Sequence, residues 1–145
     1  MDITVSFPGG KRVDAQAGAF TIRTDQPIDH GGDDSAPEPF TLFLASLVTC
    51  AGLYVIAFCR ARDISTETIR LVQRTESDPK SGRLLRVALE VHVPADFPAQ
   101  YRDAIARAAA ACKVRKTLAD PPSFEVTTTV GSCSAPASVP ARRLG

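Results

Sequence analysis

The sequence predicts an α+β fold in which short strands lie on both sides of one long apolar helix. Alternating apolar and polar residues, typical of half-buried strands, occur in both halves of the chain, for example at residues 3–7 and 85–93. Between them, residues 40–59 carry no charged side chain, and this length is typical of a long helix. Eleven prolines and nine glycines are spread over several short segments and indicate many turns.

Length and charge exclude several classes of protein. A chain of 145 residues fits one domain with its own core, which we expect over residues 1–130, followed by a Ser/Ala/Pro-rich tail over residues 131–145. The 17 basic and 16 acidic side chains give a net charge of +1. This balance lacks the basic excess needed for a dedicated nucleic-acid binder, so we expect no nucleic-acid partner.

The first part of the chain predicts a small antiparallel meander. Residues 3–7 alternate in polarity, and the turn Pro8-Gly9-Gly10-Lys11 leads to a second run at residues 12–16. A third short strand is expected at residues 20–24. The polar segment 25–37, rich in Asp and Gly, follows as a long solvated loop.

The apolar segment predicts a central helix from Phe40 to Arg62, about 34 Å long at the standard helical rise. Its length also permits a membrane span, but the strand-like segments on both sides favour a buried helix of a water-soluble protein. A domain of this size cannot easily cover such a helix on every side. We therefore expect a homodimer in which a second copy supplies the missing apolar surface.

The second half predicts two strands, a helix and a final strand. Strands are expected at residues 66–77 and 85–93, joined by a Pro/Gly turn at residues 78–82. A helix begins near Pro98, capped by Asp96, and carries a buried stripe of spaced residues. The members of this stripe are Tyr101, Ile105, Ala108 and Cys112. The last strand is expected at residues 124–130.

The four cysteines are Cys50, Cys59, Cys112 and Cys133, and they lack the density of a disulfide-stapled secreted domain. The N-terminus shows no secretory signal, so we expect a cytoplasmic protein with reduced thiols. No Cys-x-x-Cys pairing is present, and we expect no structural metal or cofactor.

Two of these thiols form the candidate site. Cys50 and Cys59 are nine residues apart on the predicted helix and point to opposite faces, so an intact helix does not let them bridge. The best partner for Cys50 is Cys112, on another buried stripe and followed by basic residues that favour a thiolate. The alternative is inert packing, the usual role of a buried cysteine, and it is preferred for Cys59 and Cys133. We interpret His30 as part of the solvated loop and His92 as exposed.

Two motifs resemble the OsmC/Ohr-like superfamily. The Gly-rich loop from Gly31 and the following helix contain Leu42-Phe43-Leu44-Ala45-Ser46-Leu47-Val48-Thr49-Cys50, which is similar to the family pattern L-x-x-A-S-L-x-x-C. The segment Cys112-Lys113-Val114-Arg115-Lys116-Thr117-Leu118 resembles the second cysteine motif of that family. The resemblance covers the chain from about residue 2 to residue 130 and implies an intertwined α+β homodimer, with long central helices flanked by mostly antiparallel sheets.

The resemblance also implies an activity, since characterised members reduce organic or fatty-acid hydroperoxides. Carried over to this chain, Cys50 is the peroxidatic cysteine and Cys112 resolves its sulfenic acid as a disulfide. A dithiol reductant of the lipoyl type then restores both thiols. The resemblance therefore implies a thiol peroxidase with an organic hydroperoxide as substrate.

The chain departs from the peroxidase pattern beside the nucleophile. Characterised peroxidases pair an arginine with a glutamate that lies nine or ten residues before the first cysteine, where this chain has Thr41 and Phe40. Glu38 is the candidate substitute for that carboxylate, and Arg23 or Arg12 for the cation.

This departure keeps a second hypothesis open. In it, the chain is a non-catalytic dimeric module that binds a small hydrophobic or thiol-bearing ligand beside Cys50. Without a nearby cation, a buried thiol stays protonated and reacts slowly, so the pKa of Cys50 distinguishes the two hypotheses.

Overall fold

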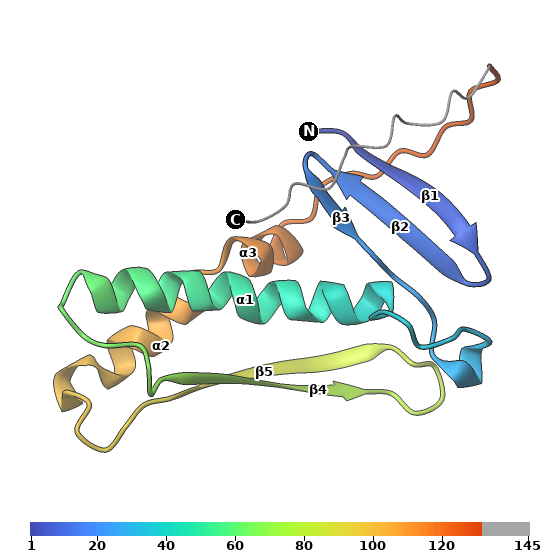
Figure 1. Cartoon of the computed structure of the whole chain (residues 1–145). Coiled ribbons are helices and arrows are strands. Elements are labelled where there is room, and N and C mark those ends of the chain that lie inside the picture. The colour runs from blue at the N-terminus through green and yellow to red at the C-terminus, as the bar shows by residue number, and fades with distance from the viewer. Residues whose placement is uncertain (132–145) are drawn as a thin grey trace, which may run out of the picture. The chain divides into compact units, whose positions relative to one another are not determined.

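The computed structural model describes residues 1–131, and the α+β prediction is confirmed (Figure 1). The described residues form two compact units. One unit comprises residues 1–42 together with residues 124–131, and the other comprises residues 43–123. The expected tail lies almost entirely outside the described residues, as does Cys133.

The first unit contains a three-stranded antiparallel sheet. Strands β1 (Ile3–Gly9), β2 (Arg12–Ala17) and β3 (Phe20–Ile22) pair in the order β1-β2-β3, which confirms the predicted meander. Gly10 has a φ of +61°, a conformation that glycine adopts without strain, and it turns the chain between β1 and β2.

One face of this sheet is apolar and exposed. Register places one apolar row across Ile3, Ala17 and Phe20, and a second row across Val5, Ala15 and Ile22. The exposed fractions are 53% for Ile3, 75% for Phe20, 53% for Val5 and 40% for Ile22. A contiguous exposed apolar surface of this kind marks an interaction surface more often than a solvated one.

The loop after β3 is built around Asp25, which is only 1% exposed. Its carboxylate accepts hydrogen bonds from the backbone N–H of Gln26 at 2.8 Å, Asp33 at 3.2 Å and Ser35 at 3.1 Å, and from the Ser35 hydroxyl at 2.6 Å. These bonds lower the pKa of Asp25 from 3.8 to about 2, the Ser35 hydroxyl contributing most. The loop at residues 25–37, which the sequence predicted to be solvated, is therefore held by hydrogen bonds to the buried carboxylate of Asp25.

Backbone packing completes this loop, which includes the short 3₁₀ helix η1 (Ile28–His30). A Cβ atom on Gly32 would lie 1.9 Å from the Gln26 carbonyl oxygen, so only glycine fits there. His30 is exposed at the end of η1. Within residues 1–131 no group of three or more His, Cys, Asp or Glu side chains is placed to hold a metal ion.

Helix α1 (Pro39–Arg60) begins one residue before its predicted start and ends two residues before its predicted end. Its buried residues follow helical spacing on one face and are Leu47, Ala51, Val55 and Cys59. Away from this face, Leu53 is 66% and Ile56 36% exposed. The helix is long and apolar enough to cross a membrane by length and composition, with 22% of its most apolar window buried. The buried central helix predicted from the sequence is thus covered on one side only.

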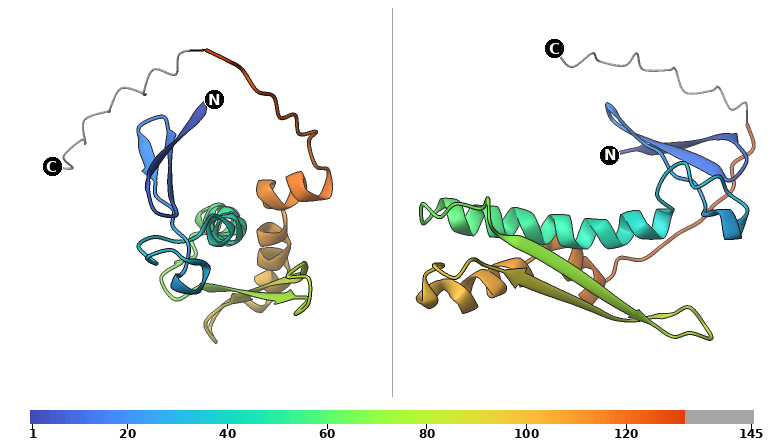
Figure 2. Two further views of the ribbon diagram at one scale, coloured as in Figure 1. Left: turned by 90° about the vertical axis from the view of Figure 1, so that its right-hand side faces the viewer. Right: turned by 60° about the horizontal axis from the view of Figure 1, so that its bottom comes forward.

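Strands β4 (Arg70–Ser77) and β5 (Leu84–His92) form an antiparallel hairpin along α1 (Figure 2). The first strand starts four residues later than predicted because residues 66–69 form a turn. Asp78 stabilises the connecting turn by accepting hydrogen bonds from the backbone N–H groups of Lys80 and Ser81. The Gln73 amide donates to the Leu44 carbonyl at 3.0 Å and joins the hairpin to α1.

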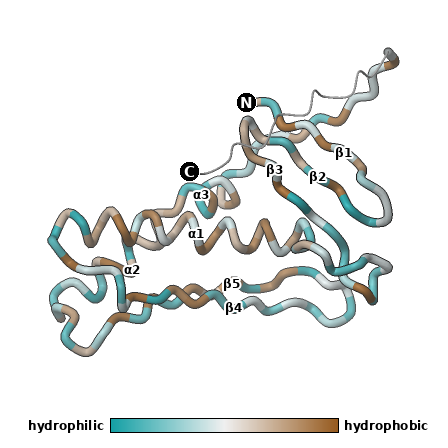
Figure 3. The backbone as a smooth tube through the Cα atoms, in the orientation of Figure 1, coloured by the Kyte–Doolittle hydropathy of each residue, from teal (hydrophilic) through white to brown (hydrophobic). Residues whose placement is uncertain are grey.

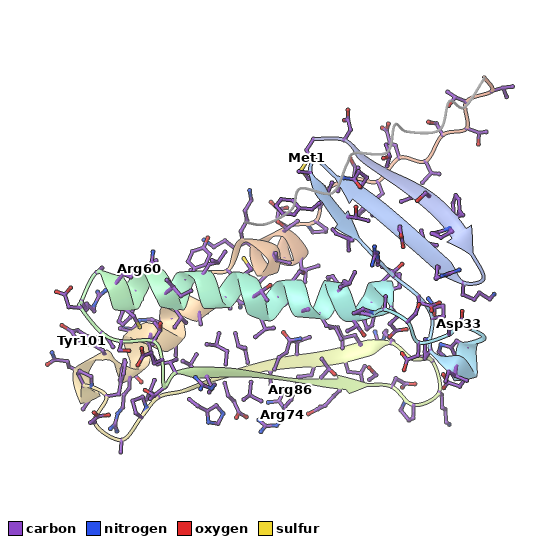
Figure 4. The ribbon with its side chains drawn as sticks, viewed as in Figure 1. Met1, Asp33, Arg60, Arg74, Arg86 and Tyr101 are labelled. Atoms are coloured by element: carbon purple, nitrogen blue, oxygen red, sulfur yellow. The ribbon has the colours of Figure 1, made fainter. Side chains whose placement is uncertain are left out.

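The two faces of the hairpin differ in polarity, as predicted for β5. Apolar residues run along β5 and α1 (Figure 3). Arg74 and Arg86 lie on the side away from α1 (Figure 4) and pair with Glu90 and Glu76. His92 is exposed and lies 3.1 Å from Glu90. The alternation therefore directs the apolar side chains of β5 toward the core of this unit.

The remaining helices are η2 (Ala99–Tyr101), α2 (Arg102–Ala110) and α3 (Lys113–Ala119). The prediction that Asp96 caps a helix near Pro98 is wrong, because the 3₁₀ turn η2 is capped by Pro98 without a side-chain bond. α2 and the following residues pack on α1 in one core cluster. Its buried members are Ala51, Val55, Cys59, Ile69, Phe97, Ile105, Ala109 and Cys112.

An aromatic clamp joins the end of α1 to η2. The Arg62 guanidinium lies 3.9 Å from the Phe58 ring centre and 5.3 Å from that of Tyr101. The two rings meet edge to face at 5.9 Å. Cation–π contacts of this kind stabilise by about 0.5–1 kcal/mol at exposed sites.

The predicted final strand at residues 124–130 is wrong. This segment has no regular secondary structure, and Phe124 and Val126 are 87% and 97% exposed. A strand requires a neighbour that takes its N–H and C=O groups, and no strand within residues 1–131 pairs with this segment.

Acid should weaken the Asp25 loop. Because the pKa of Asp25 is lowered from 3.8 to about 2 by folding, its contribution to stability is present above the unfolded pKa and is lost as pH falls toward the folded pKa. We expect Asp25→Asn to be less stable than the parent at neutral pH, with a gap that narrows below about pH 4. Urea unfolding of both proteins at several pH values measures this gap, and a gap independent of pH would contradict the assignment.

Candidate functional site

The structure brings Cys50 and Cys112 together. Cys50 lies on α1, half-buried, and packs against the core cluster, whereas Cys112 belongs to that cluster and is only 2% exposed. The Cys112 Sγ donates to the Leu47 carbonyl at 3.6 Å, one turn before Cys50 on the same helix. The predicted meeting of a thiol on the long helix with a thiol from the C-terminal part is present in the fold.

Cys112 occupies a different position from the one predicted. It is not on the stripe of α2, which ends at Ala110, but is the N-cap of α3, with φ −47° and ψ 128°. Its Sγ accepts a hydrogen bond from the Arg115 N–H at 3.5 Å. The prediction that this residue is buried nevertheless holds, because the chain turns sharply there and directs the side chain toward α1.

The surroundings of Cys50 favour its thiolate. The backbone N–H of Val114 lowers the pKa of Cys50 most, followed by the hydrogen-bonding contribution of the neighbouring Cys112 side chain. Burial opposes this change, while the backbone N–H and the ammonium charge of Lys113 add to it. The net direction is a Cys50 pKa below that of an ordinary thiol.

The surroundings of Cys112 have the opposite effect. Burial raises the pKa of Cys112, and the neighbouring Cys50 sulfur raises it further. The N–H of Arg115 lowers it, but less than burial raises it. The pair therefore consists of a half-buried Cys50 with a lowered pKa and a buried Cys112 with a raised pKa.

The other cysteines do not join this pair among the described residues. Cys59 is fully buried two turns further along α1, and burial raises its pKa. This agrees with the inert role predicted for it.

Glu38 and Arg23 belong to the first unit. Glu38 is half-buried and directly precedes α1, where its carbonyl accepts from the Leu42 N–H. Arg23 is exposed and follows β3. The groups that shift the pKa of Cys50 come from residues 112–114, and the roles of Glu38 and Arg23 stay predictions.

An apolar trough lies beside the cysteine pair, within the second unit. It encloses about 540 Å³, a size typical of small-molecule sites. Its floor and walls come from one face of β4 and β5 and from α1, α2 and α3. The lining residues are Leu47, Ala51, Gln73, Val87, Leu89, Val91, Val93, Arg102, Ile105, Ala106, Ala109, Ala110, Cys112, Arg115 and Leu118.

Sequence reasoning identified both sulfurs but missed the groups that activate one of them. The strongest influences on Cys50 are backbone N–H groups of Val114 and Lys113, which any residue except proline supplies. The basic residues after Cys112 indicated part of this effect, because the charge of Lys113 also lowers the pKa of Cys50. Little in the sequence indicated that α3 begins after Cys112, because cysteine is not among the preferred N-cap residues.

A family model described as OsmC-like protein matches residues 32–127. The chain belongs to the OsmC-like family. The match includes both cysteine motifs, as the resemblance of these motifs predicted. A comparison with curated proteins found no significant match.

Solved OsmC-like structures have the same fold. A Psychrobacter arcticus protein named for osmotic stress induction and detoxification aligns with a TM-score of 0.68 at 20% identity, covering 79% of this chain and 85% of the other. The organic hydroperoxide resistance protein OsmC of Legionella pneumophila aligns at 0.56 and 20% identity, over 81% and 87%. A Vibrio cholerae protein with captopril in one of its active sites, named for organic hydroperoxide resistance, aligns at 0.56 and 18%, over 81% and 84%. At these identities, the similarity establishes the fold.

We expect Cys50 to be the first of the described cysteines to react with an alkylating agent near neutral pH, because only its pKa is lowered. Iodoacetamide labelling of the folded protein over a pH series, followed by mass spectrometry of the peptides, gives the rate at each thiol. Cys112→Ala removes the hydrogen-bonding contribution of the Cys112 side chain and should raise the pKa of Cys50. Faster labelling of Cys112 than of Cys50 would reverse the two assignments.

Proposed function

We propose that this OsmC-like protein is a thiol peroxidase that reduces organic hydroperoxides through a Cys50–Cys112 disulfide. The observation that supports it best is the contact between these two sulfurs with opposite pKa directions. A lowered pKa suits the nucleophile, and a buried protonated thiol suits the residue that resolves it. The hydroperoxide resistance in the names of structural relatives supports the same reaction.

The first step is a two-electron oxidation of Cys50. Its thiolate attacks the terminal oxygen of the hydroperoxide, an S–O bond forms and the O–O bond breaks. The alkoxide leaves and takes a proton to become an alcohol, while Cys50 becomes a sulfenic acid. The N–H groups of Val114 and Lys113 and the Lys113 charge hold the anionic sulfur before attack.

The second step uses Cys112. Its thiol loses its proton and attacks the Cys50 sulfur, the S–S bond forms, and hydroxide leaves and combines with that proton as water. A dithiol reductant of the lipoyl type then restores both thiols and becomes a disulfide itself. In this proposal the protein acts in the cytoplasm, where thiols are kept reduced.

Two further residues complete the proposed site. Glu38 and Arg23 take the roles of the carboxylate and cation that characterised peroxidases place beside the nucleophile. In these roles Arg23 binds the peroxide oxygens and Glu38 orients the guanidinium.

Addition of cumene hydroperoxide to the reduced protein should produce a Cys50–Cys112 disulfide, detected by mass spectrometry of non-reduced peptides. Cys112→Ser should stop at the sulfenic acid, which a dimedone probe labels at Cys50. Cys50→Ser should abolish peroxide consumption by the pair, because burial raises the pKa values of Cys59 and Cys112 and disfavours their thiolates.

The matched control is Cys59→Ala, which removes a buried thiol outside the pair and should leave peroxide consumption unchanged. If Cys50→Ser consumes peroxide like the parent and no disulfide forms, the peroxidase proposal fails. The non-catalytic binding module then becomes the better account of the trough that Cys112 lines.

We also propose that the working protein is a homodimer. The supporting observation is the amount of exposed apolar surface, on α1 at Leu53 and Ile56 and on the sheet face formed by Ile3, Phe20 and their neighbours. A second copy that covers these surfaces removes them from water, and symmetric pairing is the commonest solution for such proteins.

Light scattering coupled to size exclusion should give a mass twice the 15.4 kDa of one chain. Leu53→Glu places a charge on the exposed face of α1 and should shift the protein toward the monomer, because an unpaired charge is costly in an apolar interface. Gln100→Glu adds the same charge at an exposed polar position of η2 and is the matched control, which should stay dimeric. A monomeric parent would contradict the proposal.

A further inference from the structure

We propose that Arg115 is a positioning residue for the thiol pair. Its guanidinium binds the Ala110 carbonyl, holds open the break between α2 and α3, and thereby keeps the Val114 N–H available to the Cys50 sulfur. In this role the guanidinium acts through the backbone. The proposal rests on the proposed function in one respect only, which is the use made of the Cys50 thiolate.

The break between α2 and α3 separates two groups that a continuous helix would join. In such a helix, each N–H donates to the carbonyl four residues before it, so the Val114 N–H would bind the Ala110 carbonyl. In this chain α2 ends at Ala110 and α3 begins at Lys113, with Cys112 between them at φ −47° and ψ 128°. The carbonyls at the end of α2 and the N–H groups at the start of α3 therefore need other partners.

Arg115 is the partner on the α2 side of the break. Its Nη1 donates to the Ala110 carbonyl at 3.0 Å, in place of the Val114 N–H. On the other side, the Val114 N–H is the largest of the influences that lower the pKa of Cys50. The two groups that a continuous helix would pair thus have separate partners, and Arg115 occupies one of them.

The backbone of Arg115 contacts the same break. Its N–H donates to the Cys112 Sγ at 3.5 Å, so this one residue binds both the end of α2 and the residue that precedes α3. Helix α3 does not itself favour an arginine there, because a cation in the first turn opposes the helix dipole. The same cation is favourable beside the carbonyls at the end of α2. The position of Arg115 therefore fits a role at the break better than a role within α3.

The hydrogen bond at Ala110 matters more in this role than the charge of Arg115. After the Val114 N–H, the charge that lowers the pKa of Cys50 is that of Lys113. Arg115 is exposed, where water and salt screen its charge. Its guanidinium offers several planar donors, so one of them can stay on a carbonyl.

The experiment measures alkylation of Cys50 by iodoacetamide over a pH series in the reduced full-length protein, with the peptides quantified by mass spectrometry. Arg115→Met keeps a long unbranched side chain but has no donor for the Ala110 carbonyl. It should raise the pKa of Cys50 and slow its labelling near neutral pH roughly threefold, the effect of losing one exposed hydrogen bond. The matched control is Lys116→Met, which removes the neighbouring exposed charge, leaves that bond in place and should label like the parent.

Two further measurements separate the position of the backbone from charge and from a general loss of packing. At a salt concentration of about 1 M, the difference between Arg115→Met and the parent should persist, because a hydrogen bond is not screened as an exposed charge is. Labelling of the buried Cys59 should be the same in both proteins, because the core is unchanged.

The proposal is overturned if Arg115→Met labels at Cys50 like the parent, if Lys116→Met has the same effect, if salt removes the difference, or if Cys59 becomes more reactive. Peroxide consumption is a separate readout. A parent that consumes peroxide while Arg115→Met keeps the parent's Cys50 pKa would refute this role and leave the peroxidase intact. A raised Cys50 pKa in Arg115→Met, together with a parent that consumes no peroxide, would support the role of Arg115 and refute the peroxidase.

Discussion

The arrangement of the two thiols depends on the contact between α1 and the short break that separates α2 from α3. The chain leaves α2 at Ala110 and starts α3 at Lys113, and this break presents Cys112 and two backbone N–H groups to the middle of α1. A continuous helix would use those N–H groups in its own hydrogen bonds. Because it is interrupted, they are available to a sulfur anion on α1.

The same break separates the properties of the two thiols. Cys50 is half-buried and lies near the N–H groups of Val114 and Lys113, whereas Cys112 is buried in the core cluster. Desolvation and hydrogen bonding therefore move their pKa values in opposite directions. Two chemically identical side chains therefore differ in the direction of their pKa shifts, as the proposed roles of nucleophile and resolving thiol require.

Some apolar residues of α1 and β5 are not covered by the core of the second unit. The face of α1 that carries Ala51 and Val55 packs in the core cluster of the second unit, whereas Leu53 is exposed. Near β5, the apolar side chains instead line the trough that Cys112 also borders. One pattern is typical of a subunit interface and the other of a ligand pocket.

The sequence by itself determined the fold class, most of the strands and the identity of the two thiols. Local periodicity was sufficient for these, as in the alternation of β5 and the uncharged run of α1. Periodicity failed at residues 124–130, where polarity alternates but no strand within residues 1–131 pairs with the segment. It also failed at Cys112, where α3 begins without one of the preferred N-cap residues. Only the tertiary structure decided the directions in which the pKa values of Cys50 and Cys112 shift. These shifts depend on burial and on backbone hydrogen bonds between distant segments, and the local sequence pattern predicts neither of them.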